Sequence, residues 1–263
     1  FSIAGADHWY TLENHRVRAI NNPLAQKTFV PGFLRAVGPG WTGWAVESFM
    51  DEVAHKQNVD PIDFRLSLLD ASGKNAGESP VSVGGAKRLA KVLTDIRKQT
   101  NWGQSLPKNQ GLGIAISSGQ ERDMPTWGAC VAHVEVDPET GAVKVHKLTG
   151  LLDCGTVVHP DGALAQTQGS MLWGMSLALF EGTAFEKGQV KDTNLNTYSP
   201  LRMNNLPELD ISFVQNTEFP TGLGEPGLIA VAPAIANAIF NAVGARVRDL
   251  PIRPEAVLAA MPS

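Results

Sequence analysis

The sequence predicts an α+β protein, and three observations lead to that prediction. Between residues 44 and 100, apolar residues recur at the three- and four-residue spacing of amphipathic helices. From about residue 110 they alternate with small or polar residues, which is typical of strands. With 263 residues, 43% of them hydrophobic, the chain can bury a substantial core. Helices followed by strands mixed with helices indicate α+β architecture.

The first 110 residues are expected to be mostly helical. Glycine and proline punctuate residues 1–40, which we expect to be irregular with short extended pieces. A first helix is expected over residues 44–54. Asp60 followed by Pro61 is typical of a helix N-cap and a first-turn proline, so a second helix should begin there. An apolar stripe predicts a third helix over residues 85–100.

Residues 111–263 are expected to form the α+β part of the molecule. The segment Asp137–Gly141 reads as a turn between two alternating runs, which predicts a hairpin. A helix rich in small residues follows it. The expected elements are strands around 112–116, 132–136 and 143–148, a helix over about 161–179, a strand near 211–214, and a helix from Pro233 to Gly244.

Composition excludes several classes of protein. The net charge of −4, without clustered Lys and Arg, argues against a nucleic-acid-binding protein. No apolar run reaches the roughly 20 residues that a spanning helix needs, so no membrane span is predicted in this chain. Two cysteines, Cys130 and Cys154, cannot make a disulfide framework or an iron–sulfur motif and are expected to be buried free thiols. The six histidines lack metal-ligand spacing, so no metal ligand is expected from the protein.

A glycine-rich loop near the end of the chain is the most informative segment. Gly222, Gly224 and Gly227 match the letter of the dinucleotide fingerprint G-x-G-x-x-G, which on its own is a weak signal. The fingerprint should join a strand directly to a helix, whereas Pro226 and Pro233 are expected to delay the helix here. A nicotinamide-dependent dehydrogenase is therefore kept only as an alternative.

Glu225 lies within the same loop. The following proline restricts its backbone, and the flanking glycines let a large ligand approach the main chain. A carboxylate presented from such a loop suits a general base. The alternative is a structural carboxylate that caps the next helix or pairs with a surface lysine.

Seven short motifs stand in one order along the chain: Gly32–Gly38, Ala45–Glu52, Asp60–Arg65, Val134–Asp137, Asp153–Gly155, Gly222–Pro226 and Leu250–Ile252. Together they resemble the molybdenum-cofactor subunit of the xanthine dehydrogenase and aldehyde oxidase family, with the bacterial isoquinoline 1-oxidoreductase beta-subunit type as the nearest likeness. The resemblance covers nearly the whole chain and points to the C-terminal portion of that subunit.

The resemblance implies a fold of two mixed α/β subdomains that bind molybdopterin, with residues 1–110 as the first part and 111–263 carrying the cofactor-facing helix and the glutamate loop. It implies that Glu225 is the catalytic base and that the inserted oxygen comes from water. Arg35, Gln166 and Gly169 would contact the cofactor. Gly222 and Gly224 would let it approach the main chain. The metal would be held by the pterin and by ligands that are not protein.

The implied reaction is hydroxylation of an aldehyde or of a carbon in an N-heteroaromatic ring. The implied cofactor is molybdopterin, in its plain form or as the cytosine dinucleotide. The implied partners are the N-terminal half of the subunit, as a separate or cleaved chain, and a [2Fe-2S] subunit that removes electrons. Related subunits often carry twin-arginine export signals, which favours the periplasm over the cytoplasm. A non-catalytic cofactor-binding assembly subunit stays as an alternative.

Overall fold

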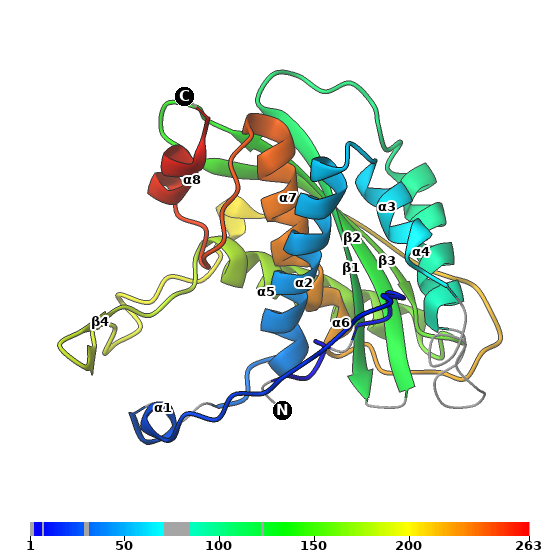
Figure 1. Ribbon diagram of the computed structural model, residues 1–263, viewed down its shortest axis with the longest axis horizontal. Helices are drawn as coiled ribbons and strands as arrows, with labels where there is room; N and C mark the ends of the chain where they lie inside the picture. Colours follow the sequence, from blue (N-terminus) through cyan, green and yellow to red (C-terminus); the bar gives the residue numbers. More distant parts are fainter. Residues whose placement is uncertain (1–2, 7, 29–31, 71–84, 122–123, 263) are drawn as a thin grey trace.

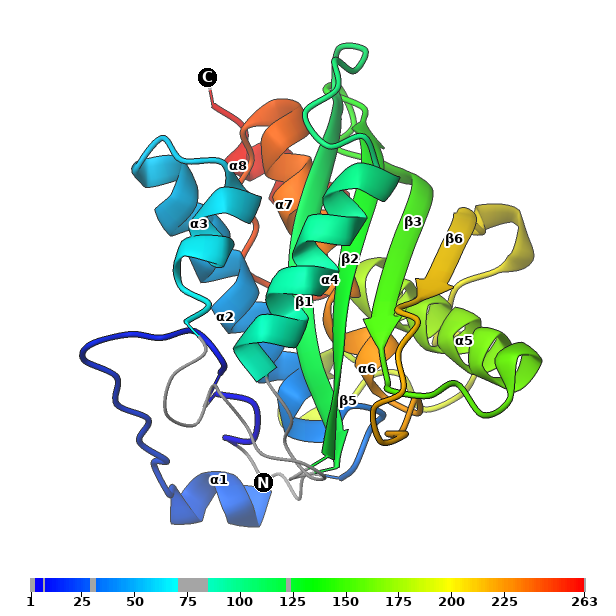
Figure 2. The same cartoon turned by 90° about the vertical axis from the view of Figure 1, so that its right-hand side faces the viewer.

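A four-stranded sheet forms the centre of the protein in a computed structural model that describes residues 3–6, 8–28, 32–70, 85–121 and 124–262. The strand order is β1-β2-β3-β6 (Figure 2). Antiparallel pairing joins β1 (Gln110–Glu121) to β2 (Met124–Val136) and β2 to β3 (Val143–Asp153). The last strand, β6 (Glu208–Phe213), runs parallel to β3, and helix α5 (Pro160–Leu179) lies in the connection between them. The predicted α+β class is confirmed.

Helices dominate the first part of the chain, as expected (Figure 1). They are α1 (Pro23–Thr28), α2 (Val37–Lys56), α3 (Pro61–Ser67) and α4 (Gly85–Gln99). The prediction was wrong about where α2 begins, because this helix already starts at Val37 and runs through Gly38-Pro39-Gly40. Pro39 lies in the first turn of α2, where a backbone N–H has no partner within the helix, so its missing donor costs nothing.

Two predicted local signals act as expected. The Asp60 side chain caps α3 by accepting hydrogen bonds from the backbone N–H groups of Ile62 at 2.9 Å and Asp63 at 3.1 Å. In the hairpin between β2 and β3, the Asp137 carboxylate accepts a hydrogen bond from the backbone N–H of Glu139 at 2.8 Å. The strands begin at Gln110, the first residue of β1. The division into two subdomains stays a prediction.

The alternation in β1 separates the two faces of the sheet. Leu112, Ile114 and Ile116 pack with α2, α3 and α4 on one face. On the other face, Gly111 and Gly113 lie directly beneath helix α7 (Val231–Val243). A Cβ atom added at Gly113 would come within 2.1 Å of the backbone nitrogen of Ala238. The small residues of β1 therefore let α7 lie close against the sheet.

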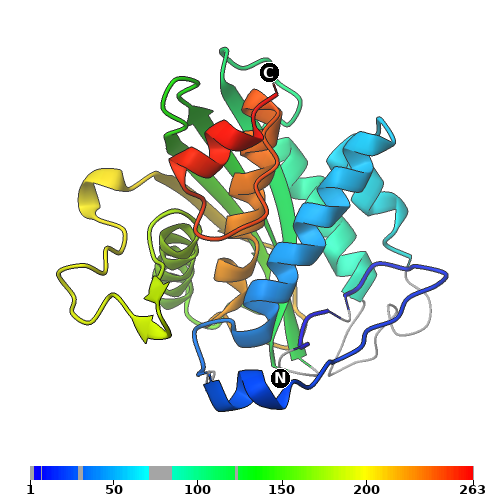
Figure 3. The same cartoon turned by 60° about the vertical axis from the view of Figure 1, so that its left-hand side comes forward.

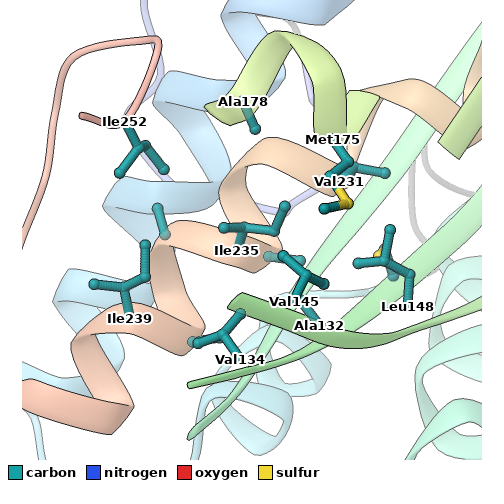
Figure 4. Close-up of a cluster of buried hydrophobic side chains, with 14 of the residues drawn as sticks. Ala132, Val134, Val145, Leu148, Met175, Ala178, Val231, Ile235, Ile239 and Ile252 are labelled. Carbon is teal, nitrogen blue, oxygen red and sulfur yellow. The ribbon is translucent and has the colours of Figure 1, made fainter. Parts of the chain in front are cut away.

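The core on the α7 face joins this helix to α5 and to the sheet. Figure 4 shows Ile235 and Ile239 of α7 directed toward Val134 and Val145 of the strands. A one-turn helix, α6 (Pro226–Ile229), precedes α7. The predicted helix start at Pro233 was wrong, because the helical turn begins directly after Glu225 and Pro233 lies in the first turn of α7.

The segment Pro226–Val243 is, among the described residues, the one long and apolar enough by composition to cross a membrane, with a mean hydropathy of 1.6. The polar residues Asn237 and Asn241 interrupt its apolar sequence. It is 72% buried inside the protein and packs on β1 and β2. This is the environment of a core helix.

The remaining elements lie at the periphery. Figure 3 shows the α2 and α7 helices side by side, with the segment of α1 away from the sheet. The two-stranded ribbon of β4 and β5 projects from the region after α5. The elements are β4 (Phe185–Glu186), β5 (Gln189–Val190), a 3-10 turn (Met203–Asn205) and α8 (Pro254–Ala260).

Candidate active site

The loop that carries Glu225 follows β6 and lies across the ends of β2 and β3. At the end of β3, the backbone carbonyl of Cys154 accepts a hydrogen bond of 2.8 Å from the N–H of Thr221. At the start of β2, the Thr126 hydroxyl lies 2.7 Å from the carbonyl oxygen of Gly222. The sheet therefore fixes the loop just before its glycines.

Arg35 joins this loop to two other segments. Its Nε donates to the carbonyl of Gly224, and its Nη2 donates to the carbonyl of Gln166 at 3.3 Å. The guanidinium also lies 6.0 Å from the ring centre of Trp173, near the limit for a cation–π contact. Arg35, which stands just before α2, thus holds the Glu225 loop and helix α5 together, although 131 and 189 residues separate it from its two carbonyl partners.

The Glu225 carboxylate is half-buried and faces the start of α2. Its Oε1 accepts a hydrogen bond of 3.2 Å from the backbone N–H of Ala36. This donor comes from an unusual backbone turn, because Ala36 and Val37 both have positive φ, at 74° and 40°. Such a conformation is rare for a β-branched residue and is typical of functional sites that hold local strain.

Charge links Arg35 to Glu225. Burial lowers the pKa of the Arg35 guanidinium, and the negative charge of Glu225 opposes that shift. The arginine stays a cation in this setting because its ordinary pKa is far above neutral. The site therefore places a permanent positive charge beside a half-buried carboxylate.

The small residues of α5 divide between two faces of that helix. One face packs on α6: a Cβ atom added at Gly227 would lie 3.1 Å from the Cβ of Ser170. The other face is exposed and carries Gln166, Gly169 and Trp173 at helical spacing. An added Cβ at Gly169 would meet nothing within 4 Å. This exposed face is open to a ligand next to Arg35.

A mostly apolar cavity of about 300 Å³ borders the same arginine. Leu34, Arg35 and Trp41 line one side of it, and Leu228 and Ile229 of α6 line another. Its lining also includes Glu181, which accepts a hydrogen bond from the Tyr198 hydroxyl. The cavity is therefore lined by residues of α6, the helical turn that follows Glu225.

Asp153 braces the base of the loop. The buried carboxylate accepts hydrogen bonds from Arg88, from Asn216 at 2.8 Å and from the N–H of Gly155 at 3.2 Å. Burial raises the pKa of Asp153, but the hydrogen bonds and the charge of Arg88 outweigh burial and hold that pKa below its usual range. An ionised Asp153 thus ties β3 to α4 and to the start of the loop.

The cysteines agree with the prediction, since both thiols are free and buried. Burial raises the pKa of Cys130 and of Cys154, which leaves both protonated at neutral pH. Across residues 3–6, 8–28, 32–70, 85–121 and 124–262, no group of three His, Cys, Asp or Glu side chains has the arrangement of a metal site.

The structure brings the predicted site residues together. Arg35 contacts Gly224 and Gln166, Glu225 contacts the residue after Arg35, and Gly169 lies one turn from Gln166 on α5. The carbonyl of Gly222 accepts its hydrogen bond from Thr126 of the sheet. The sequence reasoning missed the backbone N–H of Ala36 and the hydroxyl of Thr126. No local pattern marks either residue, because both contacts join segments far apart in the chain.

The dinucleotide alternative lacks its structural setting. Strand β6 ends at Phe213, well before Gly222, and the helix after the loop is a single turn. The fingerprint needs a strand that leads directly through the glycines into a helix.

Comparison with known proteins places the chain in a family. The family model for a molybdopterin cofactor-binding domain matches residues 88–207. The chain is 58% identical, over 98% of its length, to the "Membrane-bound aldehyde dehydrogenase [pyrroloquinoline-quinone]" of Gluconacetobacter polyoxogenes, and spans 34% of that relative. It is 28% identical to isoquinoline 1-oxidoreductase subunit beta of Brevundimonas diminuta, over 84% of this chain and 26% of that one. The isoquinoline type, which the motifs favoured, is thus the more distant of these two.

The fold is shared with solved structures as well. The aldehyde oxidoreductase of Desulfovibrio desulfuricans superposes with a TM-score of 0.70 over 87% of this chain and 41% of that one, at 18% identity. The chain therefore spans about a third of the first curated relative and under half of this structure. With its matching motifs, its family model and its fold, this chain belongs to the molybdopterin-binding subunits of the xanthine dehydrogenase and aldehyde oxidoreductase family and represents a part of such a subunit.

Proposed function

We propose that this chain supplies the general base and one wall of the cofactor site in a molybdenum hydroxylase, with Glu225 as the base. The observation that carries the proposal is the contact of the Glu225 carboxylate with the N–H of Ala36, beside Arg35. A general base needs a fixed position and access to its substrate. Glu225 has both, because the strained turn at Ala36 holds one oxygen while the side chain stays half-buried.

The residues around Glu225 fit a large anionic cofactor. The exposed face of α5 offers Gln166 as an amide donor, and Gly169 leaves room for a ring system or a phosphate to approach the helix. Arg35 adds a permanent positive charge next to that face. Once bound, the molybdenum cofactor would supply the redox chemistry. Glu225 would take a proton at its carboxylate oxygen, and Arg35 would keep the loop against α5.

Of the two implied substrate classes we propose an aldehyde, with N-heteroaromatic compounds as the second candidate. The name of the relative with 58% identity describes an aldehyde dehydrogenase. The cavity beside Arg35 suits an apolar molecule, since leucine, isoleucine and tryptophan side chains form much of its wall.

The length of the relatives supports a proposal about what completes the site. The matched region is 34% of one relative and 26% of another, so the rest of the molybdenum subunit would complete the site. We propose that this remainder covers the exposed face of α5, and that a [2Fe-2S] subunit receives the electrons.

A different cofactor appears in the name of one relative, which specifies pyrroloquinoline quinone. The family model instead describes a molybdopterin-binding domain. Acid extraction of the purified complex separates the two: fluorescent pterin derivatives with molybdenum would support our proposal, and a quinone without pterin would contradict it.

The base is tested by Glu225→Gln in the full subunit with its partners. We expect turnover to fall by about 10²- to 10⁴-fold, the usual contribution of a general base, with the molybdenum content unchanged. Glu218→Gln, an exposed glutamate of the same loop, is the matched control and should leave turnover unchanged. Full activity of Glu225→Gln would favour the non-catalytic assembly subunit. Reduced-nicotinamide fluorescence on titration would instead favour the dehydrogenase alternative.

A further inference from the structure

A pair of hydroxyl groups lies at the start of β2, beneath the Glu225 loop. Thr126 is fully buried, and its Oγ1 lies 2.7 Å from the carbonyl oxygen of Gly222 and 2.7 Å from Oγ1 of Thr221. The next residue of β2, Trp127, pairs with Asp153 at the end of β3. Thr126 is therefore held by the sheet while its hydroxyl reaches the loop.

The direction of these hydrogen bonds follows from the number of protons. A hydroxyl donates one hydrogen bond, and a carbonyl oxygen only accepts. Thr126 therefore donates to Gly222, and the Thr221 hydroxyl donates to Thr126. Successive hydrogen bonds of this kind strengthen one another when they are shielded from water.

The loop depends on such contacts because its glycines cannot hold their own conformation. Gly222 and Gly224 have no side chains to pack, and glycine has more backbone freedom than any other residue. The position of Glu225 therefore depends on the groups that bind the carbonyls before it, as well as on the N–H of Ala36. Arg35 binds Gly224, and Thr126 binds Gly222.

A separate brace holds the part of the loop that precedes the glycines. Gly155 has a φ of +72°, and an added Cβ would lie 2.2 Å from the carbonyl oxygen of Phe219. The hydroxyl of Thr156 donates to the carbonyl of Glu218 at 3.0 Å. These contacts end before Gly222. The hydrogen bond from Thr126 therefore fixes the glycine segment itself to the sheet.

We propose that Thr126 is a positioning residue for the Glu225 carboxylate, acting through the hydrogen-bonded series Thr221, Thr126 and Gly222. The inference rests on the proposed role of Glu225 as the base. Without the Thr126 hydroxyl, the glycine segment loses its hydrogen bond to β2, and the carboxylate samples positions out of reach of its proton. A displacement of about 1 Å can reduce a rate by about 100-fold.

The test compares Thr126→Val, which keeps the shape and removes the hydroxyl, with Thr126→Ser, which keeps the hydroxyl, in the full enzyme with its partner chains. Thr149→Val is the matched control, because Thr149 is a buried threonine of β3 that pairs with Val131, five positions along β2 from Thr126. The readouts are kcat, KM, molybdenum content and amide hydrogen exchange of the peptide spanning residues 218–228.

We expect Thr126→Val to lower kcat by about 10- to 100-fold with KM changed by less than about twofold, since the substrate contacts stay in place. Amide exchange over residues 218–228 should accelerate, while molybdenum content stays the same. Thr126→Ser should restore both kcat and protection. Thr149→Val should change neither.

The outcomes separate this inference from the proposed function. If Glu225→Gln is inactive while Thr126→Val keeps wild-type kcat and wild-type exchange, the positioning role is wrong and the role of Glu225 stands. If Glu225→Gln is active, the proposed function fails, and unchanged exchange in Thr126→Val would overturn the loop anchor as well. If Thr126→Val does not fold, Thr221→Val at the half-buried end of the series takes its place under the same criteria.

Discussion

Glu47, within helix α2, and Glu225, which contacts the residue before α2, differ in how deeply the protein buries their carboxylates. Glu47 lies in the middle of α2 and is 2% exposed. Its carboxylate accepts hydrogen bonds from the Tyr10 hydroxyl at 2.8 Å, from Arg65 at 2.9 Å and from the N–H of Ile116 at 3.0 Å. Glu225 is half-buried and meets the N–H of Ala36 just before the same helix.

The surroundings of Glu47 suit a structural ion pair. Burial lowers the pKa of the Arg65 guanidinium, but the charges of Glu47, Tyr10 and Asp51, together with the hydrogen bond to Glu47, outweigh burial and raise that pKa. Burial and then the charge of Glu47 raise the pKa of Tyr10. Arg65 and Tyr10 thus each keep one protonation state across the physiological range. A base must change its protonation during turnover, so a sealed carboxylate cannot act as one, whereas a half-buried carboxylate on an anchored loop can.

The largest loss of stability is expected when the buried ion pair between Glu47 and Arg65 is broken. Arg65→Met leaves the Glu47 carboxylate buried without its cation, and the free energy of unfolding should fall by about 3–5 kcal/mol. Urea denaturation of the purified protein measures this change. Arg97→Met is the matched control: Arg97 pairs with Asp60 and Asp63 at a partly exposed site, where a loss below about 1 kcal/mol is expected. Equal losses in the two variants would contradict the contrast between sealed and open pairs.

The same contrast explains how far the sequence predicts this molecule. The Asp60 cap and the Asp137 turn were predicted because each signal lies within a few residues. The start of α2 was missed because a proline flanked by glycines normally marks a loop. Glu225 was found from its glycines and from the resemblance, yet its contact with Ala36 spans 189 residues. A contact of that separation depends on how the sheet brings distant segments together, which local patterns do not encode.

Asp153 is as buried as Glu47, yet its contacts support the Glu225 loop. Its pKa is held below the usual value of 3.8, so it stabilises the fold at any pH above that value, and this contribution is lost as pH falls below it through the folded-state pKa. Asp153→Asn should therefore be less stable than wild type at pH 7, and the difference should shrink below about pH 4. Thermal melts from pH 7 to pH 3 measure it.

Arg88 provides the control for that experiment. Arg88 supplies charge that lowers the pKa of Asp153. Arg88→Met should therefore reduce how much stability is lost as pH falls from 7 to 3. The double variant should lose less than the sum of the two single losses, because both remove one interaction. Additive losses, or a constant gap between wild type and Asp153→Asn at every pH, would show that Asp153 does not act through its ionised form.

The smallest effect on stability separates the open face of α5 from its packed face. Gly169→Ala adds a methyl group that meets no atom within 4 Å, so helix propensity should stabilise the cofactor-free protein by up to about 1 kcal/mol. Gly174→Ala, on the packed face of the same helix, places a Cβ 2.9 Å from the carbonyl oxygen of Leu228 and should destabilise it. Melting temperatures of the cofactor-free variants measure both changes. If the cofactor lies along the open face, Gly169→Ala should also lower the molybdenum bound per subunit, so a more stable protein would carry less metal. A more stable Gly169→Ala variant with full molybdenum content would contradict contact between the cofactor and α5 at Gly169.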